Sequence, residues 1–205
     1  MKVARGEVLV FLDSHCEVEK DWLQPLLQRV KKNKRTVASP IIDNINLINY
    51  EFEPVSTNLR GGFDWRLDFF WEYLPALDRA KKLRDPSWSV KTPAIAGGLF
   101  AIDRDWFEEI GWYDTGMNIW GGENIELSLR VWMCGGQLEI VPCSKVGHIY
   151  KQKTSYHNDD HDINSVLGCN NWRLAEVWLD QFSILHHHFG MKLLSKNVKM
   201  IQFIL

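Results

Sequence analysis

Two residues near the beginning of the chain could hold a metal ion. Asp13 and His15 are two positions apart, so on an extended backbone both side chains leave the same face and can grip one ion between them. A carboxylate oxygen with an imidazole nitrogen suits a borderline transition metal such as manganese better than magnesium, which prefers oxygen ligands. Two ligands make only a weak site, and a turn aspartate beside a solvent-facing histidine is the alternative.

A third ligand has to come from elsewhere in the sequence. His148 follows Gly147 after a strand-like stretch, so it would also lie where a strand ends, and it completes the set best. Taken alone, His148 is more typical of a partly buried structural histidine. His157 and His161 have the spacing of a helix-borne metal pair, but the residues between them are loop formers, which favours a solvated loop.

Residues 120–124 could bind a sugar. Because they open a predicted helix, they offer free backbone N–H groups, the Glu123 carboxylate and an amide beside an aromatic face. A structural alternative stands beside this one: Glu123 only complements the positive end of the helix, and Trp120 belongs to the core. Gly97 and Gly98 likewise indicate either a bulge in a strand or a place where a ligand meets bare backbone.

These residues need strands and helices to position them. Residues 8–12 form a continuous apolar run, which predicts a strand buried on both faces, as in a parallel sheet, that ends at Asp13. A helical stripe follows over residues 22–30 and closes in basic residues. A strand followed by a helix indicates an α/β fold, and open α/β sheets bind ligands at the edge where such strands end.

The rest of the chain is less regular. We expect an irregular, aromatic-rich segment beside a site over residues 60–93, and we find no capping or turn pattern at 186–188 or 191–205. The other predicted elements are strands at 37–42 and 46–52 with a turn at Asp43 and Asn44 between them, a strand-like run at 94–102, a helix at 124–134, an edge strand at 138–142 and a helix at 171–182.

Composition excludes several classes of protein. The 205 residues are 45% hydrophobic and 24% charged, which suits one globular domain and excludes a disordered or collagen-like chain. A net charge of -2 leaves no positive field for a nucleic-acid backbone, so nucleic acid is not an expected partner. The apolar run at 8–12 is too short for a membrane span or a signal peptide. Four scattered cysteines without a CxxC pair give no zinc knuckle or redox motif.

Five segments in order resemble the polypeptide N-acetylgalactosaminyltransferases, over about residues 4–182. They are residues 9–17 (LVFLDSHCE), 96–100 (AGGLF), 120–126 (WGGENIE), 147–148 (GH) and 175–178 (AEVW). The resemblance implies an α/β fold of the GT-A type, a mixed sheet flanked by helices. It also implies transfer of N-acetylgalactosamine (GalNAc) from UDP-GalNAc to Ser or Thr of proteins in the Golgi lumen, the initiating step of mucin-type O-glycosylation, with manganese as cofactor.

The resemblance also assigns roles to residues. The metal ligands of the family match Asp13, His15 and His148. The positions around its donor match Glu123 as the catalytic residue at the transferred sugar, and Gly97, Gly98, Trp120, Asn124, Lys151 and Tyr156 as substrate-binding residues. The family retains anomeric configuration. Because no paired carboxylates stand at a defined spacing, we expect same-face attack in which a donor phosphate oxygen takes the acceptor proton.

Some features depart from the family. The chain begins at the strand that carries Asp13, so we expect the nucleotide-binding part that holds the uridine to be missing, together with any membrane anchor and lectin domain. Lys151 stands where the family has arginine, which replaces a two-pronged hydrogen-bond donor by a point charge. By resemblance, Cys134 and Cys143 are half-cystines with partners outside the chain. We therefore expect a partial GT-A domain over 1–182 and a divergent tail over 183–205.

Three functions fit these observations. The first is the catalytic core, or a shortened member, of a polypeptide GalNAc-transferase. For this function we expect that the 205 residues alone do not transfer sugar at an appreciable rate, because binding energy from the uridine would be lost. The second is an inactive relative that binds a peptide, a glycoprotein or another transferase, which Lys151 and the expected truncation favour. The third is a metal-dependent hydrolase, which is disfavoured because spacing alone positions no general base.

Overall fold

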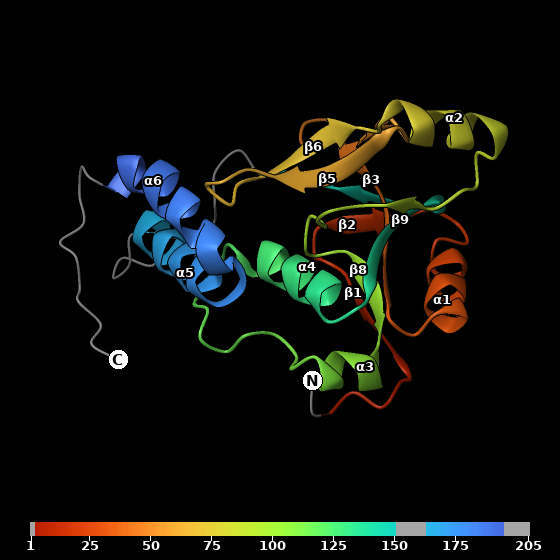
Figure 1. The fold of residues 1–205 in the computed structure, drawn as a ribbon. Coiled ribbons are helices and arrows are strands. Elements are labelled where there is room, and N and C mark those ends of the chain that lie inside the picture. The colour runs from red at the N-terminus through yellow and green to blue at the C-terminus, as the bar shows by residue number, and fades with distance from the viewer. Residues whose placement is uncertain (1–2, 151–162, 195–205) are drawn as a thin grey trace.

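One mixed β-sheet organises the chain in the computed structural model, which describes residues 3–150 and 163–194 (Figure 1). The strands run in the order β1-β8-β3-β9-β2, with β4 beside β3 and β7 beside β9. β3 and β9 are parallel, and the other strand pairs of this sheet are antiparallel. The strands are β1 (Val8–Phe11), β2 (Cys16–Val18), β3 (Thr36–Ile45), β4 (Phe52–Glu53), β7 (Val90–Lys91), β8 (Phe100–Asp103) and β9 (Gln137–His148).

Helices and a second, two-stranded sheet surround this sheet. In Figure 1, α1 lies on one side of the sheet, α4 and α5 lie on the other, and the β5-β6 hairpin with α2 lies across one end. The elements are α1 (Leu23–Lys32), β5 (Leu59–Phe63), β6 (Phe69–Tyr73), α2 (Ala76–Arg84), α3 (Arg104–Glu109), α4 (Glu123–Met133), α5 (Ile163–Trp178), the 3₁₀ turn η1 (Asp180–Phe182) and α6 (Ser183–Leu194).

The alternation of side chains along the strands gives the sheet two buried faces. Val37 packs in a core cluster with Leu127 and Val131 of α4, whereas its neighbour Ala38 packs with Leu26 of α1 on the opposite face. Successive strand residues point to opposite faces, so a continuous apolar run is what a sheet covered on both sides requires. The predicted helices at 22–30 and 124–134 are confirmed as α1 and α4.

The prediction for residues 8–12 is only partly right. β1 is a strand, but it lies at the end of the described sheet and is antiparallel to β8, and Val10 and Leu12 are exposed. The apolar run reflects packing of Val8 and Leu9 against the two faces. It carries no information about how many neighbours the strand has, since both central and terminal strands can place apolar side chains on covered faces.

Residues 138–142 are in a strand, as predicted, but this strand is not at the edge of the sheet. β9 runs over twelve residues and lies between β3 and β2 inside the sheet. Its register against β3 passes from the pair Pro40 and Val141 to the pair Ile41 and Lys145. Pro142 lies in this break, and because proline lacks the N–H that a ladder needs, a bulge accommodates it within an inner strand.

Two further predictions fail between residues 43 and 93. The turn does not fall at Asp43 and Asn44, because β3 continues to Ile45 and residues 47–49 make the turn into β4. The predicted strand at 46–52 is therefore mostly that turn. The segment 60–93 is not irregular: it forms the β5-β6 hairpin, α2 and β7. The two strands of this hairpin lack a clear alternation of apolar and polar residues, because two glycines and several aromatic residues interrupt it.

The C-terminal helices also exceed the prediction. α5 begins at Ile163, before the expected 171, and α6 forms where the sequence shows no helix signal. Tertiary contacts support α6: the ring of His187 stacks on Trp172 with centroids 4.1 Å apart, and His186 is buried with Nδ1 3.1 Å from the Trp65 carbonyl oxygen. None of the described helices combines the length and apolar character that crossing a membrane needs.

Candidate functional site

Asp13, His15 and His148 lie together at one end of the sheet. Asp13 follows β1, His15 precedes β2, and His148 is the last residue of β9. Strand pairing brings them together, because Cys16 stands opposite His148 and the Ile149 N–H donates to the His15 carbonyl oxygen at 3.1 Å. One ligand atom from each of the three side chains lies within 4.8 Å of the others.

The geometry of this metal-ligand cluster suits a divalent ion. His148 Nε2 is 3.3 Å from Asp13 Oδ2, and the rings of His15 and His148 are 4.5 Å apart with a tilt of 57°. The Asp13 side chain is 41% exposed and that of His148 is 12% exposed, so solvent reaches the cluster from the aspartate side. One carboxylate and two imidazoles form a set typical of manganese or zinc, with positions left for further ligands.

The charge of Asp13 contributes to raised pKa values at two nearby residues. Burial, with a further contribution from the Asp13 carboxylate, raises the pKa of the Cys16 thiol to about 11. Burial also raises the pKa of Tyr113 above its ordinary value, and the carboxylates of Glu123 and Asp13 add to this shift. The Tyr113 ring is edge-on to the ring of Phe11, with the centroids 5.7 Å apart. Tyr113 is not among the residues predicted from the sequence.

Gly98 faces the metal-ligand cluster directly. A Cβ atom added to Gly98 would stand 2.3 Å from Asp13 Oδ2, so any side chain at this position would require the Asp13 carboxylate to move. Gly97 has a φ of +115°, a conformation open to glycine, and its own added Cβ would meet Asn124 at 3.2 Å. Close approach of the backbone thus explains both glycines, and the alternative of a bulge inside a strand is wrong because β8 begins only at Phe100.

The start of α4 forms the other side of the site. Glu123 is the first residue of α4, and its Oε2 accepts a hydrogen bond of 2.7 Å from the Gly121 N–H. The structural role proposed as its alternative is therefore present. Asn124 Nδ2 donates to the Ile95 carbonyl oxygen at 3.1 Å and ties α4 to the loop that carries Gly97. Trp120 is 42% exposed, so its assignment to the core is wrong.

An apolar cavity adjoins the metal-ligand cluster. It has a volume of about 210 Å³ and is lined by β3, by Val55 and Leu59, by Trp71 of β6 and by Tyr150. The Tyr150 ring lies 4.5 Å from the ring of His148, so one wall of the cavity contacts a ligand residue. The sequence hinted at this wall only through its abundance of aromatic residues before residue 93.

Two predicted site residues, Lys151 and Tyr156, lie outside the described residues, as do His157 and His161. The structure brings the other predicted residues to two adjoining places. The first is the metal-ligand cluster of Asp13, His15 and His148, with Gly98 against the Asp13 carboxylate. Gly97, Trp120, Glu123 and Asn124 belong to the start of α4 and the loop bonded to it.

Comparison with known families decides the family of this chain. Residues 1–111 match the family described as glycosyl transferase family 2. The chain belongs to glycosyl transferase family 2. Residues 78–157 also match the family described as the N-terminal domain of galactosyltransferase, and this match includes Glu123 and His148.

The individual relatives that this chain resembles include polypeptide N-acetylgalactosaminyltransferases. The chain is 53% identical over 180 residues to polypeptide N-acetylgalactosaminyltransferase 14 of Homo sapiens, which covers 88% of this chain and 32% of the relative. It is 48% identical over 185 residues to polypeptide N-acetylgalactosaminyltransferase 4 of Caenorhabditis elegans, covering 90% of this chain and 31% of the relative. The chain thus spans about a third of the length of these relatives, and the expected resemblance is confirmed.

A solved glycosyltransferase has the same fold. The crystal structure of GalNAc-T7 with UDP, GalNAc and Mn2+ superposes with a TM-score of 0.77 at 40% sequence identity, over 88% of this chain and 34% of that chain. The predicted GT-A fold, a mixed sheet flanked by helices, is therefore confirmed. The division into a partial domain over 1–182 and a tail over 183–205 stays a prediction.

Proposed function

We propose that this chain binds Mn2+ and UDP-GalNAc and transfers GalNAc, with retention of configuration, to a Ser or Thr hydroxyl of a peptide or protein. The observation that carries the proposal is the convergence of Asp13, His15 and His148, with Gly98 packed against the Asp13 carboxylate. The relatives named polypeptide N-acetylgalactosaminyltransferases support the substrate. By the same similarity, we propose the Golgi lumen as the place of action.

Three side chains would hold the ion: the Asp13 carboxylate and the His15 and His148 imidazoles. A bound Mn2+ supplies a Lewis acid that stabilises negative charge on a departing diphosphate. Gly98 leaves room for the Asp13 carboxylate in this cluster, because a Cβ atom at residue 98 would occupy the place of that carboxylate. Lys151 and Tyr156, which lie outside the described residues, are proposed to contact the same diphosphate.

Glu123 is proposed to orient the transferred sugar. Its carboxylate is fixed by the Gly121 N–H, which leaves its remaining lone pairs to accept hydrogen bonds from sugar hydroxyls. Trp120 offers an exposed aromatic face beside it, and Asn124 fixes the adjoining loop. In the proposed same-face reaction, the bond from the sugar to the donor phosphate breaks as the bond to the acceptor oxygen forms. The acceptor proton passes to a phosphate oxygen of the donor.

The acceptor peptide is proposed to lie across the apolar cavity beside His148. Trp71 and Tyr150 give this cavity aromatic walls, which suit an apolar side chain next to the reacting Ser or Thr. Since Tyr150 contacts His148, a peptide held there would bring its hydroxyl to the metal-ligand cluster.

The test measures binding and transfer separately. Mn2+ affinity is measured by the electron paramagnetic resonance signal of free Mn2+, UDP-GalNAc binding by calorimetry with Mn2+, and transfer to a Thr-containing peptide by mass spectrometry. We expect binding of both ligands and, at a low rate, a mass gain of one GalNAc on the peptide. A chain that binds neither ligand contradicts the proposal.

A second candidate is a relative that binds donor and acceptor without turnover. The substitution of Lys151 for the arginine of the family favours it, because one ammonium gives phosphate fewer directed hydrogen bonds than a guanidinium. Ligand binding without peptide modification would select this candidate, and restoration of transfer by Lys151→Arg would identify the residue responsible.

A further inference from the structure

The loop of residues 118–123 that leads into α4 has an unfavourable backbone. Ile119 has a φ of +54°, and Gly121 and Gly122 have φ values of +104° and +85°. Glycine adopts such values freely, but a β-branched residue such as isoleucine is strained there. The loop therefore needs groups from elsewhere in the fold to hold it in this shape.

Asn170 of α5 supplies such groups. Its Oδ1 accepts a hydrogen bond from the Asn118 N–H at 3.0 Å. Its Nδ2 donates to the carbonyl oxygens of Asn118 and Gly121, each at 2.9 Å, with the Trp120 carbonyl oxygen at 3.5 Å. The side chain is 2% exposed, so these bonds do not compete with water. One side-chain amide thus bonds to the backbone at both Asn118 and Gly121, on either side of the strained Ile119.

The face of α5 around Asn170 fits the loop closely. Leu167, Asn170 and Asn171 share this face by their spacing of three and four residues. A Cβ atom added to Gly121 would stand 2.5 Å from Leu167 Cδ1, and one added to Gly122 would stand 2.7 Å from Asn171 Oδ1. The two glycines therefore serve contact with α5 as well as backbone conformation.

We propose that Asn170 is a positioning residue that sets the place of the Glu123 carboxylate. Asn170 fixes the Gly121 carbonyl oxygen, and the Gly121 N–H in turn donates to Glu123 Oε2 at 2.7 Å. Asn170 thereby acts on Glu123 through one residue and without contact to substrate. Its consequence for sugar transfer rests on the proposed function, whereas its hold on the loop does not.

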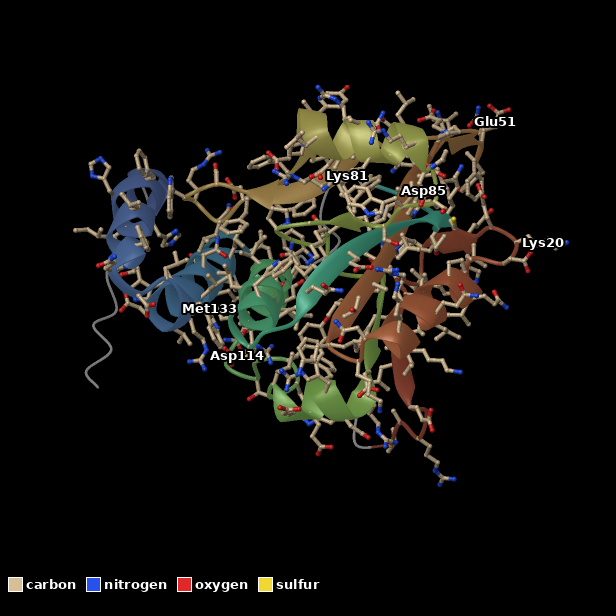
Figure 2. All side chains as sticks on the ribbon, turned by 45° about the vertical axis from the view of Figure 1, so that its right-hand side comes forward. Lys20, Glu51, Lys81, Asp85, Asp114 and Met133 are labelled. Carbon is tan, nitrogen blue, oxygen red and sulfur yellow. The ribbon has the colours of Figure 1, made fainter. Side chains whose placement is uncertain are left out.

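Other contacts keep α5 in place when Asn170 is changed. Arg173 donates to Asp114, a residue labelled in Figure 2, through Nε at 2.7 Å and Nη2 at 3.0 Å. Trp178 Nε1 donates to Glu126 of α4 at 3.0 Å, and Leu174 is fully buried in the core against α4. A change at Asn170 should therefore release the loop without detaching the helix.

The test uses Asn170→Ala, which removes every bond of the side chain, and Asn170→Asp, which turns the donor into an oxygen facing two carbonyl oxygens. Cys169→Ser, an exposed neighbour on α5, is the matched control. Hydrogen exchange over residues 118–126 should be about 10-fold faster in both Asn170 variants. Mn2+ affinity should change less than about twofold, since the metal-ligand cluster lies on strands that Asn170 does not contact.

Turnover gives the second readout. Release of GalNAc from UDP-GalNAc with Mn2+ should fall about 10- to 100-fold in both variants, while the Kd for UDP stays constant, because the sugar alone is misplaced. Unchanged exchange in the loop overturns the inference, and so does parallel loss of Mn2+ binding and thermal stability, which would indicate a general structural role. If the wild-type chain binds neither Mn2+ nor donor, the proposed function fails, and the exchange measurement alone decides the role of Asn170.

Discussion

The two sides of the site are held by different kinds of interaction. The metal-ligand cluster lies on strand ends, and backbone pairing of β2 with β9 brings His15 to His148. The loop at 118–123 has no strand partner among the described residues, and its shape depends on side-chain hydrogen bonds from Asn170. Backbone register is hard to shift because a slip moves every side chain to the other face, whereas a side-chain clamp can be lost through one substitution. The metal side should therefore be the more robust of the two against changes elsewhere in the protein.

The largest expected effect comes from removing a ligand. His148→Ala takes away one of the three proposed metal ligands, so Mn2+ affinity should fall at least about 100-fold, more than the loss typical of a supporting residue. Titration with Mn2+, followed by the electron paramagnetic resonance signal of the free ion, measures this. His188→Ala, an exposed histidine of α6, is the matched control. Retained affinity in His148→Ala would mean that the three side chains do not bind one ion.

A large effect is also expected from Glu123→Gln. If Glu123 contacts the sugar as proposed, turnover should fall by a factor of about 100 because that charged contact is lost, while the amide oxygen can still accept the bond from the Gly121 N–H. GalNAc release and thermal melting are measured together, with the exposed Glu109→Gln as control. If the melting temperature falls in proportion to turnover, Glu123 serves only the helix start.

Gly98→Ala tests how closely the backbone at residue 98 approaches Asp13 on the metal side of the site. The added methyl group would meet the Asp13 carboxylate and push it out of the cluster, so Mn2+ affinity should fall about 10-fold. Gly6→Ala, whose added Cβ would lie 3.3 Å from the nearest backbone oxygen, is the control for the loss of a glycine. Equal affinities in the two variants would show that the Asp13 side chain moves aside without consequence.

The smallest effect concerns the packing of α6. Burial lowers the pKa of His186 and nearby His187 lowers it further, while the Trp65 carbonyl oxygen and the charges of Asp64 and Asp68 act in the opposite direction. A depressed histidine pKa means that the unfolded chain binds the proton more readily. Stability is therefore full above the unfolded pKa of about 6.5 and declines as the pH falls below it.

Thermal melting between pH 7.5 and 5.5 measures this decline. In His186→Gln the melting temperature should depend less on pH than in the wild type. In His188→Gln, which changes an exposed histidine, its pH dependence should equal that of the wild type. An equal slope in wild type and His186→Gln would assign the pH dependence to other groups.

The sequence predicted elements well where a single periodicity runs through them. The stripe at 22–30 and the helix before Gly135 are local patterns, and both form as expected in α1 and α4. β9 was misjudged because Pro142 resembles an edge signal, and the bulge that accommodates it depends on the register with β3. α6 could not be predicted because its support comes from Trp172 and Trp65, which are distant in sequence.

By itself, the sequence determined the chemistry available to this protein: the Asp13-x-His15 spacing, the glycine pairs, and a carboxylate at the start of a helix. These features are local, so residue type and the two-residue period of extended backbone are enough to read them. Only the tertiary structure decided that His148 meets Asp13, that a side chain at residue 98 would displace the Asp13 carboxylate, and that Asn170 bonds the loop before Glu123. Each of these depends on which distant segments pair and in what register, and that is set by burial of the whole sheet between its helices.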